Sequence, residues 1–204
     1  MKLYSNKQSP SCKRAIAAAH ELGLKLDVVE LEFSKGDMQK PEYLAKNPMG
    51  KVPTFEDDDG WMLWESAAIV AYLASKNPQA NLVPSDPRAR AEVARWTLWN
   101  ASHFEAAVFR VAFEKLVKPF MGQTPDEAKI AEGKEWFARF APVLNANLEG
   151  KTWMTGNAFS AADINLGTTV ELAAACGLEF TPYRHITAWL SRLQARDCWK
   201  KASS

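Results

Sequence analysis

The first eighty residues of this chain alternate between strand-like and helix-like segments, whereas the rest of its 204 residues show helical patterns only. Helical spacing is clear in Ala15, Ile16, Ala19 and Leu22, and the turn Asp58-Asp59-Gly60 is typical of a hairpin. We expect strands at residues 2–5, 25–31, 54–56 and 62–64. We expect helices at residues 10–22 and 66–75, and a short helix at residues 41–46. The order of these elements along the chain predicts an α/β sandwich.

The remainder of the chain is expected to form a helical domain. A proline-rich linker at residues 77–87 precedes it. Ser160 and Asp163 have the spacing of a capping box and predict a helix start. We expect helices at residues 88–118, 126–148 (with a kink near Pro142), 161–176 and 186–196. The chain therefore divides into predicted domains at residues 1–80 and 88–204.

The bulk composition excludes several classes of protein. Apolar residues make up 47% and charged residues 24%, which is ordinary for a globular chain. A formal net charge of +1 disfavours a nucleic-acid partner. No apolar run approaches the roughly 20 residues of a membrane span, and the polar N-terminus is not that of a signal peptide.

The cysteines indicate a reducing environment. Cys12, Cys176 and Cys198 are odd in number and far apart, which argues against a disulfide framework and favours a cytoplasmic location. The histidines are equally scattered, and no group of Cys, His and carboxylate residues has the spacing of metal ligands. We therefore predict no metal site.

The segment Ser9-Pro10-Ser11-Cys12 has the spacing of a Cys-x-x-Cys redox motif, with serine in place of the first cysteine. Pro10 suits the first helical position, so Ser9 would stand at a helix N-terminus, where free N–H groups and the helix dipole stabilise an anion. Such a serine could hold the thiolate of another molecule, or could simply cap the helix. Ser11 is a weaker candidate for the same role, and Cys12 fits a small packed side chain better.

The segment Gly50-Lys51-Val52-Pro53 precedes the predicted hairpin. If the Val52–Pro53 bond is cis, Val52 can offer its N–H and its C=O to an extended peptide ligand. Lys51 could then pair with a carboxylate of that ligand, or could be an ordinary surface lysine.

The pair Glu65-Ser66 follows the hairpin and opens the next predicted helix. The backbone N–H and hydroxyl of Ser66 would suit an α-carboxylate, and Glu65 could accept from the neighbouring ammonium. Capping of the helix by either residue is the alternative. Further along, His103 and Phe104 belong to an aromatic helix and are candidates to line an apolar pocket, although His103 could be a core histidine.

Taken together, these residues resemble the cytosolic glutathione transferases over essentially the whole chain, and most of all the phi class in a bacterial-type form. The resemblance rests on Ser9, Asn47-Pro48-Met49-Gly50-Lys51-Val52-Pro53, Glu65-Ser66-Ala67-Ala68-Ile69, Ser102-His103-Phe104-Glu105, Ala112-Phe113-Glu114-Lys115, Lys118-Pro119 and Ser160–Asp163.

This resemblance implies a thioredoxin-like N-terminal domain, an all-α C-terminal domain and a homodimer with the active site at the cleft between the domains. It implies glutathione as co-substrate and conjugation of its thiol to hydrophobic electrophiles, or peroxide reduction, in detoxification. Ser9 would be catalytic, and an electrophile would lie near His103 and Phe104. The implied glutathione contacts are Gln39, Lys51, Val52, Pro53, Glu65 and Ser66.

The chain departs from the phi pattern at two places. Met38 and Gln39 stand where a basic pair is usual, so only Gln39 could contact the glycine end of glutathione. Lys51 stands where glutamine is usual and could supply the missing cation.

Two other functions fit parts of the sequence. Gly50-Lys51-Val52-Pro53 with Phe55-Glu56 also resembles the N-terminal part of translation elongation factor 1B gamma, which would make the chain a non-catalytic interaction module. The other function is that of a glutathione-dependent thiol oxidoreductase that uses Cys12. Against it, serine occupies the first position of the Cys-x-x-Cys motif, which holds the attacking cysteine.

Overall fold

The computed structural model describes residues 1–203, which divide into two compact units. The first comprises Met1–Val83 together with the residues from Arg196 onward, and the second comprises Pro84–Ala195. The first unit combines a sheet with helices and the second is helical, which confirms the predicted fold class.

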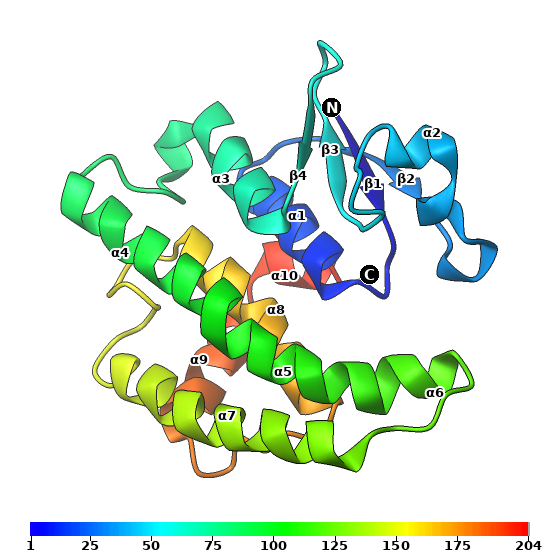
Figure 1. Cartoon of the computed structure of the whole chain (residues 1–204). Coiled ribbons are helices and arrows are strands. Elements are labelled where there is room, and N and C mark those ends of the chain that lie inside the picture. Colours follow the sequence, from blue (N-terminus) through cyan, green and yellow to red (C-terminus); the bar gives the residue numbers. More distant parts are fainter. Residues whose placement is uncertain (204) are drawn as a thin grey trace. The chain divides into compact units, whose positions relative to one another are not determined.

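The elements of the first unit appear in blue to green and in red in Figure 1. Its strands are β1 (Lys2–Ser5), β2 (Asp27–Glu30), β3 (Thr54–Glu56) and β4 (Met62–Trp64). Its α-helices are α1 (Pro10–Glu21), α2 (Pro41–Leu44), α3 (Ser66–Lys76) and α10 (Asp197–Lys201), with 3₁₀ turns at Phe33–Lys35, Asp37–Gln39 and Pro78–Ala80. Every strand and α-helix predicted before residue 80 is present, with its ends within two residues of the predicted ones.

The four strands form one mixed sheet in the order β2-β1-β3-β4. β1 is parallel to β2, whereas β3 is antiparallel to both β1 and β4. The register pairs Tyr4 with Thr54 and Thr54 with Trp64. The ends of β1, β2 and β4 and the start of β3 therefore lie at the same end of the sheet.

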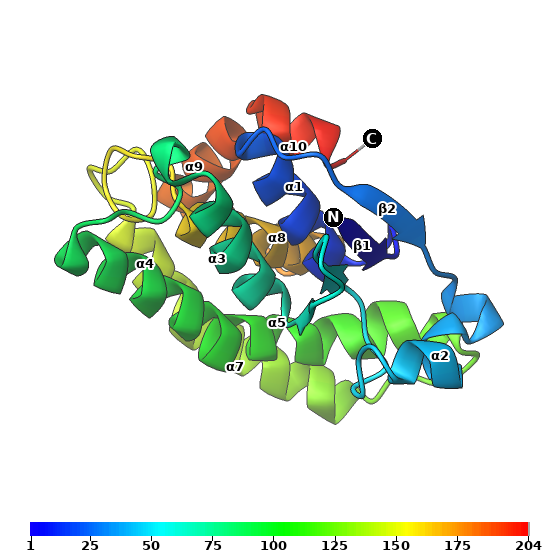
Figure 2. The same cartoon turned by 90° about the horizontal axis from the view of Figure 1, so that it is seen from above.

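The two faces of the sheet carry different helices. Leu3 pairs with Phe55, both side chains are fully buried, and the Phe55 ring contacts Tyr72 of α3. Alternation along the strands turns Tyr4 and Thr54 to the opposite face, where Tyr43 of α2 contacts both. α1 lies beside α3, as Figure 2 shows from above, so these two helices cover one face and α2 covers the other.

The end of the chain belongs to the first unit, which differs from the predicted domain at residues 88–204. α10 packs on α1, where Cys198 and Trp199 are buried and Lys13 lies over the Trp199 ring. Arg196 also pairs with Glu21 of α1. Burial of a large aromatic side chain next to a fixed ion pair attaches this last helix to the sheet unit.

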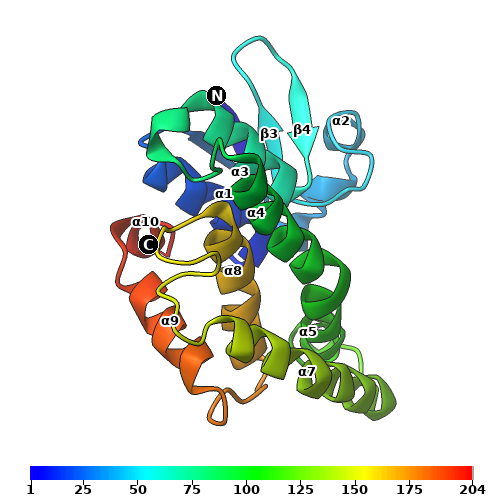
Figure 3. The same cartoon turned by 90° about the vertical axis from the view of Figure 1, so that its left-hand side faces the viewer.

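The second unit is built from helices that Figures 1 and 3 show in green to orange. They are α4 (Pro87–Trp99), α5 (Glu105–Ala112), α6 (Lys118–Phe120), α7 (Glu127–Asn147), α8 (Ala161–Ala175) and α9 (Arg184–Gln194). α8 contacts α4, α5 and α9 and is buried over most of its length, including its polar residues Asp163, Asn165, Thr168 and Thr169.

The predicted helix at residues 88–118 is interrupted twice by π-helical turns, at Asn100–Phe104 and Phe113–Val117. The Glu105 N–H donates to the Asn100 carbonyl and the Lys118 N–H to the Phe113 carbonyl, each five residues back. The extra residue in each π-helical turn rotates the side chains that follow it about the helix axis. A sequence pattern with a period of 3.6 residues does not predict this rotation.

The capping box at the start of α8 is confirmed. The Ser160 N–H donates to Asp163 Oδ2 at 2.9 Å, and Asp163 Oδ1 accepts from the Met154 N–H and the Trp189 ring N–H, each at 2.8 Å. Burial raises the pKa of the Asp163 carboxyl, and these hydrogen bonds oppose that rise. One acidic side chain therefore joins the start of α8 to α9.

None of the helices in residues 1–203 has the length and apolar character needed to cross a bilayer. Within the same residues, no three or more His, Cys, Asp or Glu side chains are grouped so that they could hold a metal ion.

The β3–β4 hairpin, seen in Figure 3, is tied to α3 through Asp57. This buried carboxylate accepts hydrogen bonds from the Tyr72 hydroxyl and, at 2.7 Å, from Lys76 Nζ. The Lys76 and Tyr72 donors lower the pKa of Asp57 to about 2. Because the pKa is lower in the folded state, the stabilisation is present above the ordinary carboxyl pKa of about 4 and is lost as the pH falls towards 2.

We predict that Asp57→Asn lowers the free energy of unfolding at pH 7 by about 1–2 kcal/mol, because a charged acceptor is replaced by a neutral one. The variant should also lose less stability than the wild type between pH 4 and 2. Urea unfolding at a series of pH values measures both effects. Asp27→Asn, which removes an exposed acid of β2, is the control, and equal pH profiles for wild type and Asp57→Asn would contradict the prediction.

Candidate functional site

Three predicted segments meet at one end of the sheet in the first unit. Ser9 follows β1, Val52 and Pro53 precede β3, and Glu65 with Ser66 follows β4. The strand directions place all of these positions at the same sheet edge. The chain after β2 reaches this end too, since the Leu31 N–H donates to the Ser5 carbonyl at 2.7 Å. The sheet topology therefore assembles the site from segments far apart in sequence.

Ser9 is the N-cap of α1 and is half-buried. Its Oγ accepts from the Cys12 N–H at 3.4 Å, so the capping interpretation is confirmed. That contact uses the hydroxyl as an acceptor and leaves its hydrogen available for donation. Capping of α1 and donation to an anion are therefore compatible in one side chain.

Cys12 is fully buried, with its sulfur accepting from the Asn6 N–H at 3.4 Å. Burial raises the pKa of the Cys12 thiol, and the polar groups of Ser5, Asn6 and Ser9 near the sulfur only partly oppose the rise. A thiol that is inaccessible and protonated is a poor nucleophile. Ser11, one residue earlier on α1, is half-buried.

The Val52–Pro53 peptide bond is cis. Within residues 1–203, neither the N–H nor the C=O of Val52 has a hydrogen-bond partner. The preceding carbonyl, of Lys51, is held firmly: it accepts from the Tyr43 hydroxyl at 2.6 Å and from Asn47 Nδ2 at 2.8 Å. Two unused backbone groups are thus presented from a fixed loop, next to the exposed side chain of Lys51.

Gln39 is exposed, and its Nε2 lies 3.5 Å from the Gly50 carbonyl oxygen. Gly50 has φ +59°, and a Cβ there would lie 2.8 Å from Gln39 Nε2 and 3.1 Å from the Met38 carbonyl oxygen. Glycine is therefore required where the two segments approach. Met38 is 6% exposed and packs in the core. Of Met38 and Gln39, which stand where the phi class usually has a basic pair, only Gln39 can therefore contact a ligand.

Glu65 has φ 72° and ψ 107°, a backbone conformation that non-glycine residues rarely adopt. Such a residue costs on the order of 1–3 kcal/mol and is found mainly at functional sites. Its side chain is exposed and does not cap α3. The first turn of α3 therefore presents backbone N–H groups and the positive end of the helix dipole without a side-chain cap.

Ser66, the first residue of α3, is 7% exposed, and its Oγ accepts from Arg14 Nη1 at 2.9 Å. Arg14 is a residue that the sequence analysis missed, as are Tyr43 and Asn47, which hold the Lys51 carbonyl. A signal for Arg14 was present: it lies three and four residues before Ala17 and Ala18, on the buried side of α1.

The two electrophile-site candidates differ in exposure. His103 is exposed, with its ring 5.6 Å from that of Phe140. Phe104 is 0% exposed, stacked on Trp99 at 5.6 Å and close to Phe137 at 5.9 Å. A side chain with no accessible surface cannot touch a ligand, so we correct the prediction and assign Phe104 to the aromatic core of the second unit.

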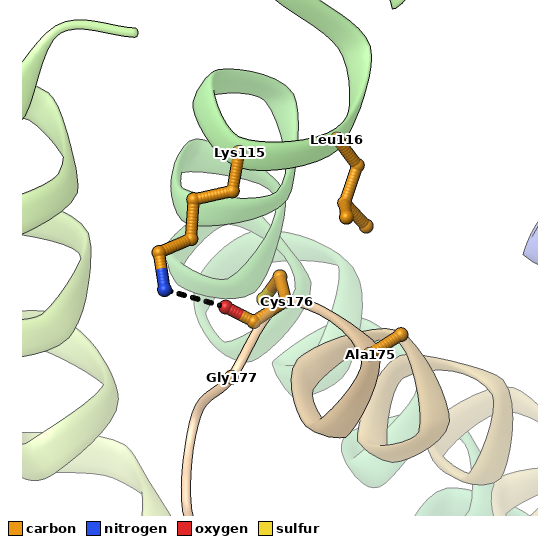
Figure 4. A pocket seen from close by; sticks show the side chains of 5 residues that line it. All are labelled: Lys115, Leu116, Ala175, Cys176 and Gly177. Carbon is orange, nitrogen blue, oxygen red and sulfur yellow. Dashed lines mark hydrogen bonds between the residues drawn. The ribbon is translucent and has the colours of Figure 1, made fainter. Parts of the chain in front are cut away.

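An open hollow in the second unit is lined by Lys115, Leu116, Ala175, Cys176 and Gly177 (Figure 4). Lys115 Nζ donates to the Cys176 carbonyl at 3.0 Å, just past the end of α8. This contact is that of a cation capping a helix C-terminus. The hollow contains none of the predicted site residues.

Models of two protein families match most of the chain. The glutathione S-transferase N-terminal domain matches residues 1–75, and the glutathione S-transferase C-terminal domain matches residues 104–197. The N-terminal match covers the whole of the sheet edge described above.

Known proteins match along the full length. A probable glutathione S-transferase GSTF2 of Oryza sativa is 33% identical, over 100% of this chain and 96% of the rice protein. Glutathione transferase F7 of Populus trichocarpa has a TM-score of 0.90 at 27% identity, covering 99% of this chain and 97% of that one.

Maize glutathione S-transferase I, solved with an atrazine glutathione conjugate, has a TM-score of 0.88 at 30% identity, covering 99% and 95% of the two chains. These three relatives are plant proteins, so they do not support the bacterial-type form expected from the sequence. The two family models and the full-length relatives agree, and this chain therefore belongs to the glutathione S-transferase family.

Proposed function

We propose that this protein is a phi-class-like glutathione transferase that conjugates the thiolate of glutathione to hydrophobic electrophiles. The observation that carries the proposal is the sheet edge where Ser9, Val52 and Ser66 meet, each with a hydrogen-bonding group that the fold leaves available for a ligand. Support also comes from the maize relative, which was solved with a glutathione conjugate. Reduction of peroxides by glutathione is a second activity of the same proposed site.

Each part of glutathione has a proposed partner. The γ-glutamyl α-carboxylate is bound by Ser66 and the first turn of α3, and Glu65 accepts from its ammonium. The backbone of Val52, fixed by Pro53, pairs with the cysteinyl residue. The glycine carboxylate lies near Lys51 and Gln39, both of which are exposed.

Ser9 is proposed to donate its hydroxyl hydrogen to the sulfur. If this lowers a thiol pKa from about 8.5 to about 6.5, the thiolate fraction at pH 7 rises about 25-fold. Intrinsic nucleophilicity falls about 6- to 10-fold over the same shift. The net gain is only a few-fold, so placing the electrophile next to the sulfur must supply much of the remaining acceleration. His103, exposed on the second unit, is the residue proposed to contact the electrophile.

We also propose that the protein is a cytoplasmic homodimer that acts in detoxification, as the resemblance to the phi class implies. Buried and reduced cysteines support a reducing location, because Cys12, Cys176 and Cys198 are all free thiols.

Two alternatives are less well supported. An interaction module of the elongation factor 1B gamma type would not need the available hydroxyl of Ser9 or the strained Glu65 at the start of α3. An oxidoreductase using Cys12 would need an accessible thiol with a low pKa, whereas burial makes this thiol inaccessible and raises its pKa.

We predict that Ser9→Ala reduces kcat/KM for conjugation of glutathione to 1-chloro-2,4-dinitrobenzene at pH 7 by about two- to fourfold, because the thiolate fraction falls about 25-fold while the intrinsic nucleophilicity of the sulfur rises about 6- to 10-fold. The apparent pKa in the pH–rate profile should rise by about one to two units. Ser11→Ala is the matched variant and should keep the wild-type profile. Turnover by Ser9→Ala equal to that of the wild type at saturating glutathione would reject Ser9, and loss in Ser11→Ala alone would transfer the role to Ser11.

We predict that the three cysteines react with a thiol-specific chromogenic disulfide only after unfolding in urea, because all three are buried. Cys12→Ser should keep conjugating activity and lose no disulfide reductase activity. A fast-reacting thiol in the native protein that disappears in Cys12→Ser would support the oxidoreductase alternative instead.

We predict that Lys51→Met raises the KM for glutathione about two- to fivefold and leaves kcat unchanged, as expected for one exposed ion pair. The wild-type KM should rise with salt concentration and that of the variant should rise less, since salt screens exposed charges. Steady-state kinetics from low to high salt test both effects, with Lys46→Met as a control on a neighbouring cation that pairs with Glu56. An equal salt dependence in wild type and Lys51→Met would exclude Lys51 from the glycine-carboxylate site.

A further inference from the structure

A buried arginine lies directly behind the start of α3. Arg14, on α1, is 3% exposed, and its Nη1 donates to Ser66 Oγ at 2.9 Å. α1 and α3 pack against each other, and α1 carries several small buried residues, among them Ala15 and Ala18. Charged residues are seldom buried in this way, because removing a charge from water is costly.

The chemistry of this contact fixes the direction of the Ser66 hydroxyl. A guanidinium group has five donors and no acceptor, so the Ser66 oxygen must accept from Arg14. The hydroxyl hydrogen therefore points away from Arg14 and is available to a different acceptor. A charged donor on the oxygen also polarises the O–H bond and makes it a stronger donor.

The surroundings of Ser66 select the kind of acceptor. Ser66 opens an 11-residue helix whose N-cap residue, Glu65, provides no side-chain hydrogen bond. An acceptor at this point would meet the Ser66 hydroxyl, the N–H groups of the first turn and the positive end of the helix dipole. A carboxylate fits these donors, since it has two oxygens and a full negative charge.

We propose that Arg14 is a positioning residue that orients the Ser66 hydroxyl towards the α-carboxylate of the γ-glutamyl group, and so makes the enzyme discriminate in favour of ligands that carry this carboxylate. The inference rests on the proposed function, because it assumes that glutathione binds at Ser66. Arg14 does not touch the ligand in this account and acts only through Ser66.

Arg14 also makes interactions besides the one with Ser66, so its replacement has structural consequences as well. A loss of activity alone would therefore not test the inference. The test compares two ligands that differ only in the α-carboxylate: glutathione, and the analogue with a 4-aminobutyryl group in place of γ-glutamyl. Damage to the fold lowers kcat/KM for both ligands by the same factor, whereas loss of Ser66 orientation lowers it for glutathione only.

The experiment measures kcat/KM for both ligands in the wild type, Ser66→Ala, Arg14→Met, Arg14→Lys and the double variant Arg14→Met/Ser66→Ala. We expect the wild-type preference for glutathione to fall about tenfold or more in Ser66→Ala, and by a similar factor in Arg14→Met. The double variant should lose no more preference than Ser66→Ala, because Arg14 acts through Ser66. Arg14→Lys, which keeps a buried donor, should recover part of the preference.

The outcomes separate the inference from the proposed function. Equal kcat/KM for both ligands in the wild type would reject Ser66 as the carboxylate site, and with it the inference. A preference lost in Ser66→Ala but retained in folded Arg14→Met would overturn the role of Arg14 and leave the glutathione site intact. If Arg14→Met does not fold, as judged by circular dichroism, Arg14→Lys decides: an unchanged preference overturns the inference, and a reduced one supports it.

Discussion

The antiparallel pairing of β3 with both β1 and β4 is the constraint on which the candidate site depends. Tyr4 pairs with Thr54, and Thr54 with Trp64, so the residues just after β1 and β4 and just before β3 must share one sheet edge. A shift of one residue in this register would also exchange the two faces of β3 and expose Phe55. Burial of Phe55 against α3 therefore fixes the core and the site together.

Two serines of the candidate site share a feature: the oxygen of each hydroxyl group already accepts a hydrogen bond from within the first unit. Ser9 Oγ accepts from a backbone N–H of its own helix, and Ser66 Oγ accepts from a buried guanidinium. In both cases the hydrogen is left for a ligand, and the position of the oxygen is fixed by groups inside the unit. A site prepared in this way pays less in conformational entropy when it binds an anion.

Much of the first unit could be predicted from its sequence, because glycine, proline and aspartate mark its turns. Thr54–Glu56 and Met62–Trp64 flank an Asp-Asp-Gly turn, and Pro10 marks the first turn of α1. Arg14 could not be assigned a partner in this way, since its contact with Ser66 joins residues 52 positions apart. The π-helical turn at Asn100–Phe104 could not be predicted either, because local propensities do not distinguish it from the α-helix on either side.

The sequence by itself determined which residue types stand at the helix starts and turns, and these are local properties of φ, ψ and capping. Only the tertiary structure decided which of those residues are exposed. It buries Phe104 in an aromatic core and Cys12 in the first turn of α1, and it leaves Ser9 half-buried. Exposure depends on what packs against a residue from distant parts of the chain, and packing between segments is not encoded in any one of them.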